Sequence, residues 1–244
     1  MCSIQSVLFV LFILQQQSSA LVLKYFDIRG AAETSRILLT LAGEQFDDVR
    51  FKIDETTFKS TAFDTAKENG DLKANLNRAP VLVANDGTTI GQSRSIERYI
   101  SKQFNLMGNS PEEEAVIDCI AEHCRDVKDA ATRKGFSKFT RNKTEEEKAV
   151  ARAEWFNDDL PTMLGKIEDY LKEIGSNSNG CSVGSSPSYA DVVIWSLLRD
   201  CPSSDTKDML KAVEDCQKLN SIADNIAAHP NVSSYIKKRP KTMF

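Results

Sequence analysis

The most constraining feature of the sequence is a change of hydrophobic pattern at residues 105–111, NLMGNSP. Before this segment, short apolar runs that contain Val and aromatic residues alternate with stretches of helical spacing. After it, nearly every segment has helical spacing alone. Gly, Asn, Ser and Pro interrupt both patterns, as they do in linkers. We therefore predict a small α/β domain over residues 21–104, a linker over 105–111 and an all-helical domain over 112–244.

The first domain begins with the run LVLKYF at residues 21–26, whose composition suits a buried strand. A helical segment follows and should stop at Gly43. The other predicted elements are strands at 46–51, 81–83 and 88–91, a weak helical pattern over 54–77, a helix over 93–104, and later helices over about 111–136, 144–173, 188–200, 206–216 and 221–228, with a final turn from 231. A βαβ unit followed by a β-hairpin and a helix predicts a thioredoxin-like sheet.

The first twenty residues have the composition of a secretory signal peptide. The apolar run at residues 7–14 is too short to span a bilayer, and Ser18 and Ala20 fit a cleavage site after residue 20. Because no Lys or Arg precedes the run, a cytoplasmic location is the alternative to secretion. We expect no stable membrane span in the mature chain. In a secreted chain, the sequons at Asn142 and Asn231 would accept glycans.

Charge, cysteine and histidine usage argue against several other functions. The net charge of −4, with basic residues spread along the chain, gives no electrostatic footprint for nucleic acid. Five cysteines follow the leader, without a C-x-x-C pair, so neither a disulfide framework nor a cysteine-rich metal site is expected. With only two histidines in the chain, no metal cofactor is predicted.

Four segments, in the right order, resemble cytosolic glutathione transferases of the sigma class and related nematode and protozoan groups. They are LKYFDIRGAAETSRILLTLAG, RAPVL with GQSRSIERYI, SPSYADVVIW, and YIKKRPKTMF. The resemblance covers nearly all of the chain after the leader. It implies a homodimer that conjugates glutathione to small hydrophobic electrophiles. Some relatives are peroxidases or glutathione-dependent prostaglandin D synthases.

Tyr25 matches the catalytic tyrosine of this family, which holds the glutathione sulfur as a thiolate. The thiolate is the nucleophile, and a hydrogen bond to the charged sulfur lowers the thiol pKa. The resemblance carries this assignment, because a Tyr in an apolar strand would otherwise be assigned to the core.

The resemblance assigns five further residues to glutathione binding. Pro80 stands where the family has a cis proline, and the backbone of Ala79 would pair with the cysteinyl part of glutathione. A trans proline that begins a strand is the alternative. Gln92 and Ser93 match a pair at a helix start, where free N–H groups suit the γ-glutamyl carboxylate. Alternatively, Ser93 is simply an N-cap. Phe58 would lie by the glycine end of glutathione.

Asp126 matches an acidic residue that reaches the glutathione amine of the other subunit in sigma-like dimers. Some relatives bind a divalent metal on this helix, but the matching positions here are Glu122, Arg125 and Asp126, and Arg125 argues against that site. The lysine that binds the glycine carboxylate has three candidates, which are Lys59, Lys67 and Lys73.

Ala31 stands where the family commonly has an Arg near the catalytic tyrosine. A cation there would lower the thiol pKa, so we expect weaker thiolate activation unless Arg29 substitutes. Ser188 and Asp191 form an S-x-x-D helix start, which the family uses for folding. We therefore assign both a structural capping role.

Two other functions compete with conjugation. Loss of Tyr25 would have favoured a non-catalytic ligand-binding or crystallin-like structural protein, but Tyr25 is present. A thiol–disulfide oxidoreductase of the glutaredoxin or omega type would have Cys at the end of the first strand, and residues 21–104 contain none. The sequence therefore predicts a glutathione transferase, with the non-catalytic binder as the alternative.

Overall fold

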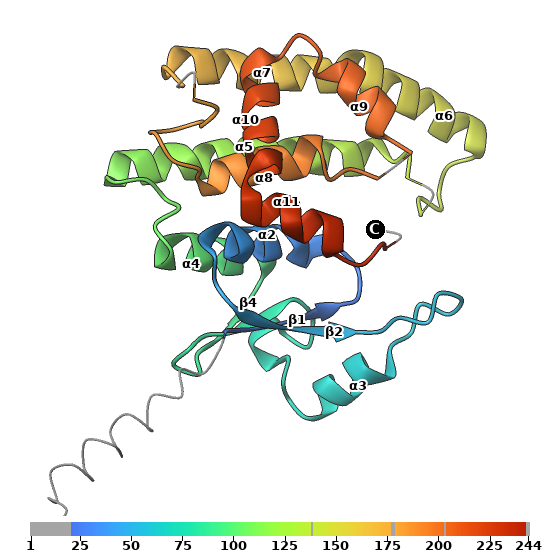
Figure 1. Ribbon diagram of the computed structural model, residues 1–244. Coiled ribbons are helices and arrows are strands. Elements are labelled where there is room, and N and C mark those ends of the chain that lie inside the picture. The colour runs from blue at the N-terminus through green and yellow to red at the C-terminus, as the bar shows by residue number, and fades with distance from the viewer. Residues whose placement is uncertain (1–20, 138, 177–178, 203, 243–244) are drawn as a thin grey trace, which may run out of the picture. The chain divides into compact units, whose positions relative to one another are not determined.

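The computed structural model describes residues 21–137, 139–176, 179–202 and 204–242 (Figure 1). The leader predicted over residues 1–20 lies outside the described residues. The chain forms two compact units. The first contains the residues up to Ile28 and Gln45–Ile96, and the second contains Arg29–Glu44 and the residues from Glu97 onward.

The first unit is built on a four-stranded sheet with the order β2-β1-β3-β4. Its strands are β1 (Leu21–Phe26), β2 (Phe46–Phe51), β3 (Val81–Val83) and β4 (Thr89–Gly91). β1 is parallel to β2 and antiparallel to β3, and β3 is antiparallel to β4. The thioredoxin-like prediction is confirmed, and the last strand begins one residue later than predicted.

The first unit has a hydrophobic cluster where the sheet packs against α3. β1 buries every second residue, as expected where strand side chains alternate between faces. Phe51, Leu72 and Val81 form a buried cluster with Ala66 of α3 (Thr61–Glu68). α3 and the 3₁₀ turn η2 (Lys73–Asn75) occupy the segment that had only a weak helical pattern. α4 (Ser93–Gln103) follows β4 and contains the boundary between the units.

The described part of the second unit is helical. It begins with the 3₁₀ turn η1 (Gly30–Ala32) and α2 (Glu33–Ala42), which ends at Gly43 in the left-handed conformation, as predicted. The later elements are α5 (Pro111–Lys134), α6 (Glu145–Glu154), the π-helical turn η3 (Trp155–Asp159), α7 (Leu160–Glu173), α8 (Tyr189–Leu198), α9 (Thr206–Ala212), α10 (Gln217–Ala228) and α11 (Pro230–Lys238).

α8 is the central helix of the second unit. Nine of its ten residues are buried, and it contacts both α5 and α10, so it has no face left for solvent. The capping box predicted at its start is present. The buried carboxylate of Asp191 accepts hydrogen bonds from the N–H of Ser188 and the N–H of Ser182, both at 2.7 Å.

The helix predicted over residues 144–173 is interrupted by the π-helical turn. The N–H of Leu160 reaches the carbonyl of Trp155, which is an i→i+5 bond. An α-helix turns about 100° per residue and would place residues five apart on different faces. The wider turn lets both Trp155 and Leu160 be buried.

α10 begins four residues earlier than its sequence pattern predicted. Glu168 of α7, which is almost fully buried, accepts the N–H groups of Lys218 and Leu219, each at 3.0 Å. A side chain from another helix therefore satisfies the first turn. Where only a turn was predicted, Pro230 opens α11 as a full helix, because proline suits the first helical position.

Candidate active site

The sheet register places Tyr25, Pro80 and Gln92 in one row. Lys24 of β1 pairs with Val81 of β3, and Val81 pairs with Gly91 of β4. Because both strand pairs are antiparallel, one step further along each strand brings Tyr25, Pro80 and Gln92 side by side in the next row. Three predicted glutathione residues, widely separated in sequence, thus meet at one edge of the sheet.

Tyr25 is part of the central strand and is only 8% exposed. It pairs with Arg50 of β2. Its ring meets that of Phe26 edge to face, with the ring centroids 5.5 Å apart. Neighbours on both sides therefore fix the backbone that carries the phenol.

The Ala79–Pro80 peptide bond is cis, as predicted. The carbonyl of Pro80 accepts a hydrogen bond of 2.9 Å from the side-chain amide of Asn75, which is buried. Sequence reasoning missed Asn75, because it lies in a polar segment without a clear pattern. We assign it a positioning role at this edge.

Gly91 lets β4 pack closely against η2, just before Gln92. A Cβ at this position would lie 2.4 Å from the carbonyl oxygen of Ala74 in η2, so only glycine fits. Gln92 follows at a φ of 65°, and its carbonyl accepts the N–H of Ile96 at 3.0 Å. Gln92 therefore takes the N-cap position, and the alternative that Ser93 is the N-cap is wrong. The first N–H groups of α4 begin at the edge that holds Tyr25.

Phe58 lies in the loop between β2 and α3. Its side chain is 56% exposed, and its φ is 56°. The loop is closed by Asp54, whose carboxylate accepts from the backbone and hydroxyl of Thr57. These hydrogen bonds lower the pKa of Asp54. The loop therefore holds Phe58 with its aromatic ring toward solvent.

The three candidate lysines have different surroundings. Lys67 is 3.0 Å from the carboxylate of Asp64, and its ammonium lies over the ring of Phe63 at 5.1 Å. Lys59 lies in the loop beside Phe58. Lys73 is exposed on η2, the turn that packs against Gly91. Lys73 is thus the candidate whose element packs against β4.

The predicted dimer residue, Asp126, is exposed on α5. Glu122, one turn earlier, contacts Arg98 and lies 2.7 Å from Arg125. Burial raises the pKa of Glu122, but hydrogen bonds from the two arginines outweigh it and lower the pKa overall. In the described chain, no three His, Cys, Asp or Glu side chains are grouped as metal ligands.

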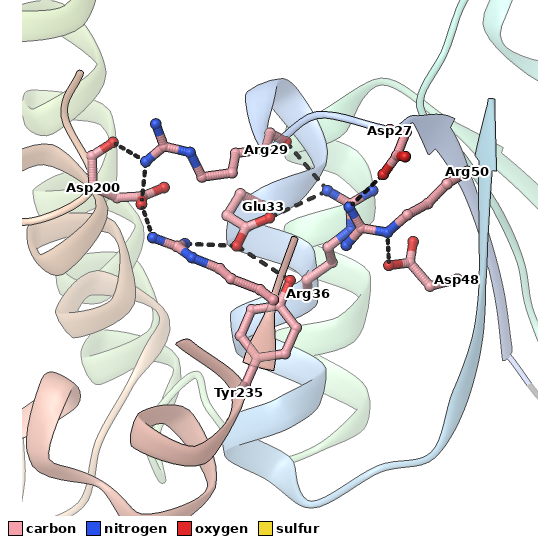
Figure 2. A network of polar contacts seen from close by, with 9 residues as sticks. Asp27, Arg29, Glu33, Arg36, Asp48, Arg50, Asp200 and Tyr235 are labelled. Atoms are coloured by element: carbon pink, nitrogen blue, oxygen red, sulfur yellow. Dashed lines mark hydrogen bonds and ion pairs between the residues drawn. The ribbon is translucent and has the colours of Figure 1, made fainter. Parts of the chain in front are cut away.

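Figure 2 shows a buried network of charges in the second unit. One oxygen of Asp200 accepts from Arg29 at 2.8 Å and from Arg239 at 2.7 Å. Glu33 accepts from Arg239 at 2.8 Å, from Arg36 at 3.2 Å and from the hydroxyl of Tyr235 at 3.2 Å. The contacts of Arg50 in the same figure belong to the first unit.

This network determines the surroundings of Arg29. Its guanidinium is paired with Asp200, a carboxylate that it shares with Arg239. Burial lowers the pKa of Arg239, but Asp200 and Glu33 raise it overall, so Arg239 stays charged. Asp200 and Arg239 were not identified from sequence, because they are far from Arg29 along the chain.

A cavity of about 320 Å³ lies within the second unit. Its apolar lining includes Val127, Phe136, Trp155, Phe156, Leu197 and Met209. The π-helical turn contributes both Trp155 and Phe156. The cavity has the size and apolar character of a small-molecule site, and helical spacing alone did not predict it.

Comparison with known proteins identifies the family of this chain. Residues 21–102 match the glutathione S-transferase N-terminal domain, and residues 130–239 match the C-terminal domain. The chain is 31% identical to glutathione S-transferase 1 of Ascaris suum, covering 91% of this chain and 98% of that protein. It is 29% identical to hematopoietic prostaglandin D synthase of Gallus gallus, covering 90% and 96%. The crystal structure of the Ascaris lumbricoides glutathione S-transferase superposes with a TM-score of 0.72 at 26% identity, covering 92% of this chain and 100% of that one. With a domain match at each end and a sheet edge that carries Tyr25, this chain belongs to the glutathione S-transferase family.

Proposed function

We propose that this protein transfers the glutathione thiolate to small hydrophobic electrophiles and that Tyr25 is its catalytic residue. The observation that carries the proposal is the row of Tyr25, Pro80 and Gln92 at one sheet edge, where α4 also begins. A hydrogen-bond donor and a helix N-terminus there suit two negative groups of bound glutathione, its thiolate and its γ-glutamyl carboxylate.

In this mechanism each group has one task. The Tyr25 hydroxyl donates to the glutathione sulfur and favours its anion, and one unit of pKa shift is worth about 1.4 kcal/mol. The N–H groups at the start of α4, with the Ser93 hydroxyl, bind the γ-glutamyl carboxylate. The backbone of Ala79 pairs with the cysteinyl part. The thiolate then attacks the electrophile.

We assign the electrophile to the apolar cavity of the second unit. The π-helical turn supports this assignment, because such turns occur frequently at functional sites. Trp155 and Phe156 are both buried in its wall and provide flat apolar surface for an aromatic or aliphatic ligand.

The proposal is tested by comparing the full chain with Tyr25→Phe. We expect both to bind immobilised glutathione, and we expect kcat/KM with an aryl halide to fall about 100-fold in the variant, as when an oxyanion donor is removed. Tyr99→Phe on α4 serves as the matched control. A prostaglandin endoperoxide should be assayed beside the aryl halide, because one relative is named as a prostaglandin D synthase.

Three outcomes would contradict the proposal. Failure of the parent chain to bind glutathione would remove its basis. Binding without turnover of any electrophile would favour the non-catalytic binder. Equal rates in the parent and Tyr25→Phe would show that another group activates the thiol.

Lys73 is our choice for the glycine carboxylate of glutathione. Its element packs against Gly91, whereas Lys67 is already paired with Asp64. We expect Lys73→Met to raise the KM for glutathione about tenfold, with kcat changed less, and Lys67→Met and Lys59→Met to have little effect. The largest effect in Lys59→Met would transfer the role to the Phe58 loop.

We also propose a homodimer in which Asp126 binds the glutathione amine of the other subunit. The exposure of Asp126 and its match to the family's acidic residue support this assignment. Analytical ultracentrifugation should give twice the mass of the chain, and Asp126→Asn should raise the KM for glutathione without dissociating the dimer. A monomer with normal glutathione affinity would contradict it.

Secretion remains a proposal based on the leader. Among the described residues, no helix is both long and apolar enough to cross a bilayer. Asn142 and Asn231 are both exposed, which is compatible with glycans. Expression in a secretory cell line should give protein in the medium that begins at Leu21, with a mass that falls on glycosidase treatment. Retention of the intact leader in the cytoplasm would contradict the proposal.

A further inference from the structure

Arg152, near the end of α6, joins that helix to the wall of the apolar cavity. Its Nη1 donates a hydrogen bond of 2.6 Å to the carboxylate of Asp205, and its Nη2 donates one of 2.6 Å to the carboxylate of Asp208. Nη2 also donates to the carbonyl of Ser204 at 3.1 Å. All three acceptors lie in or just before the first turn of α9, so one guanidinium holds the beginning of this helix (Figure 1).

The same guanidinium covers the aromatic part of the cavity wall. Its central carbon lies 4.6 Å from the ring centroid of Phe156 and 5.9 Å from that of Phe136. Both phenylalanines line the cavity. A guanidinium within about 6 Å of a ring centroid is attracted to the ring. Arg152 therefore fixes the aromatic wall and the start of α9 with respect to each other.

α9 forms part of the cavity wall but buries little apolar surface. Asp205, its N-cap residue, and Met209 line the cavity, and of the seven described residues of α9, Met209 alone is buried. The helix packs on η3 and α7. Because tertiary packing supplies most of the stability of a short helix, the contacts of Arg152 matter for where α9 lies. The guanidinium binds three acceptors in a partly buried setting, and such charge networks contribute more than single surface pairs.

We infer that Arg152 is a positioning residue that holds α9 against the aromatic wall and thereby limits the length of the ligand that the cavity accepts. It acts through α9 and the two phenylalanine rings. Without it, α9 moves away from the wall, so short ligands lose apolar contacts and long ligands gain room. This inference rests on the proposed function only in that the same cavity takes the electrophile.

Binding is measured on the full chain without glutathione, so the result is independent of conjugation. The probes are neutral primary alcohols of increasing length, namely hexanol, octanol, decanol and dodecanol. Equilibrium dialysis gives their dissociation constants, and the fluorescence of Trp155 in the cavity wall is a second signal. In the parent, affinity should rise about fourfold with each methylene, as expected for burial of apolar surface, and should stop rising once the cavity is full.

Arg152→Met should move this limit to longer alcohols. At about fourfold per methylene, two more buried methylenes would raise the ratio of dodecanol affinity to hexanol affinity about 15-fold. Arg152→Lys keeps the charge but loses the forked geometry, so it should give an intermediate ratio. Lys148→Met is the matched control, because Lys148 pairs with Glu145 of the same helix, and its ratio should equal that of the parent.

Asp208→Asn tests the same contact from the other helix, and it decides the test if Arg152→Met does not fold. Among the described residues, those that line the cavity do not include Asp208, so its effect on binding must pass through Arg152. The ratio should rise in this variant too, but by less, because Asp205 still holds the guanidinium. Asp169→Asn is the control, because Asp169 is an exposed residue of α7 that pairs with Lys172.

Several results would overturn the inference. They are an unchanged affinity ratio in both Arg152→Met and Asp208→Asn, binding of all four alcohols weakened by the same factor, and a parent that binds no alcohol or shows no length limit. Uniform weakening is what a purely structural role for Arg152 would give. A parent chain that conjugates aryl halides while the ratio stays unchanged in the variants would lose the inference and keep the proposed function. A ratio that rises in the variants of a chain that conjugates nothing would do the reverse.

Discussion

The Arg29 guanidinium donates to the Asp200 carboxylate over 2.8 Å, although 171 positions separate the two residues. Asp200 also accepts from Arg239, so one carboxylate compensates two guanidiniums in a buried setting. Removal of the negative charge would leave both buried guanidiniums without this carboxylate partner. The contact therefore stabilises the second unit because one buried carboxylate offsets two guanidiniums at once.

Asp200→Asn should destabilise the protein by about 3 kcal/mol, because breaking a buried ion pair leaves uncompensated charge. Denaturant unfolding followed by circular dichroism measures the change. Asp224→Asn is the control, since Asp224 pairs with Arg199 but is 68% exposed, and surface pairs contribute about 1 kcal/mol or less. Equal losses of unfolding free energy in the two variants would show that burial does not increase the contribution of the ion pairs to stability.

Glu168→Gln should cost about 2 kcal/mol of stability. The carboxylate accepts two N–H groups at the start of α10 and compensates the positive end of that helix, and an amide has only one oxygen to offer. Thermal unfolding gives the loss, with Glu173→Gln at the exposed end of α7, the helix that also contains Glu168, as the control. An unchanged midpoint in Glu168→Gln would mean that the first turn of α10 does not need the Glu168 carboxylate.

Asp191 should make stability depend on pH in the direction opposite to most carboxylates. Burial raises its pKa to about 6, although hydrogen bonds from Ser182 and Ser188 lower it. Between its unfolded pKa of about 4 and pH 6, the unfolded chain releases the proton first, so stability falls as the pH rises.

Asp191→Asn removes this titration. The free energy of unfolding of the parent minus that of the variant should decrease by up to about 3 kcal/mol from pH 4 to pH 6 and stay constant above pH 6. Urea unfolding at a series of pH values measures this difference. A difference that increases with pH would mean that the hydrogen bonds, and not burial, dominate.

Ala31→Arg should restore thiolate activation. Ala31 is exposed, and the nearby Arg29 is held by Asp200. A new cation should shift the acidic limb of the pH profile of kcat/KM by about one unit toward lower pH. Ala31→Gln, similar in length but neutral, is the control, and an equal shift in both variants would exclude a charge effect.

The sequence predicted the elements that local pattern determines. The alternation in β1 and the glycine after α2 are visible within a few residues, and both were confirmed. Tyr25 came only from family resemblance, since its strand would otherwise make it a core residue. The predicted residues that meet at the sheet edge were then placed together by strand register.

What the sequence did not predict depends on contacts between distant segments. Asn75 was missed because its function depends on Pro80, and Gly91 because only the approach of Ala74 excludes a side chain. The π-helical turn has no spacing signal that distinguishes it from α-helix. The start of α10 depends on Glu168, a residue of another helix.

The pairing of Glu33 with Arg239 can form only late in the synthesis of the chain. Their positions differ by 206, so at about 5 to 20 residues per second the ribosome adds Arg239 roughly 10 to 40 s after Glu33. During that interval the buried carboxylate of α2 has Arg36 beside it but still lacks Arg239. α2 therefore gains its full set of arginine partners only after α11 has been synthesised, and slow translation of the later helices prolongs this interval.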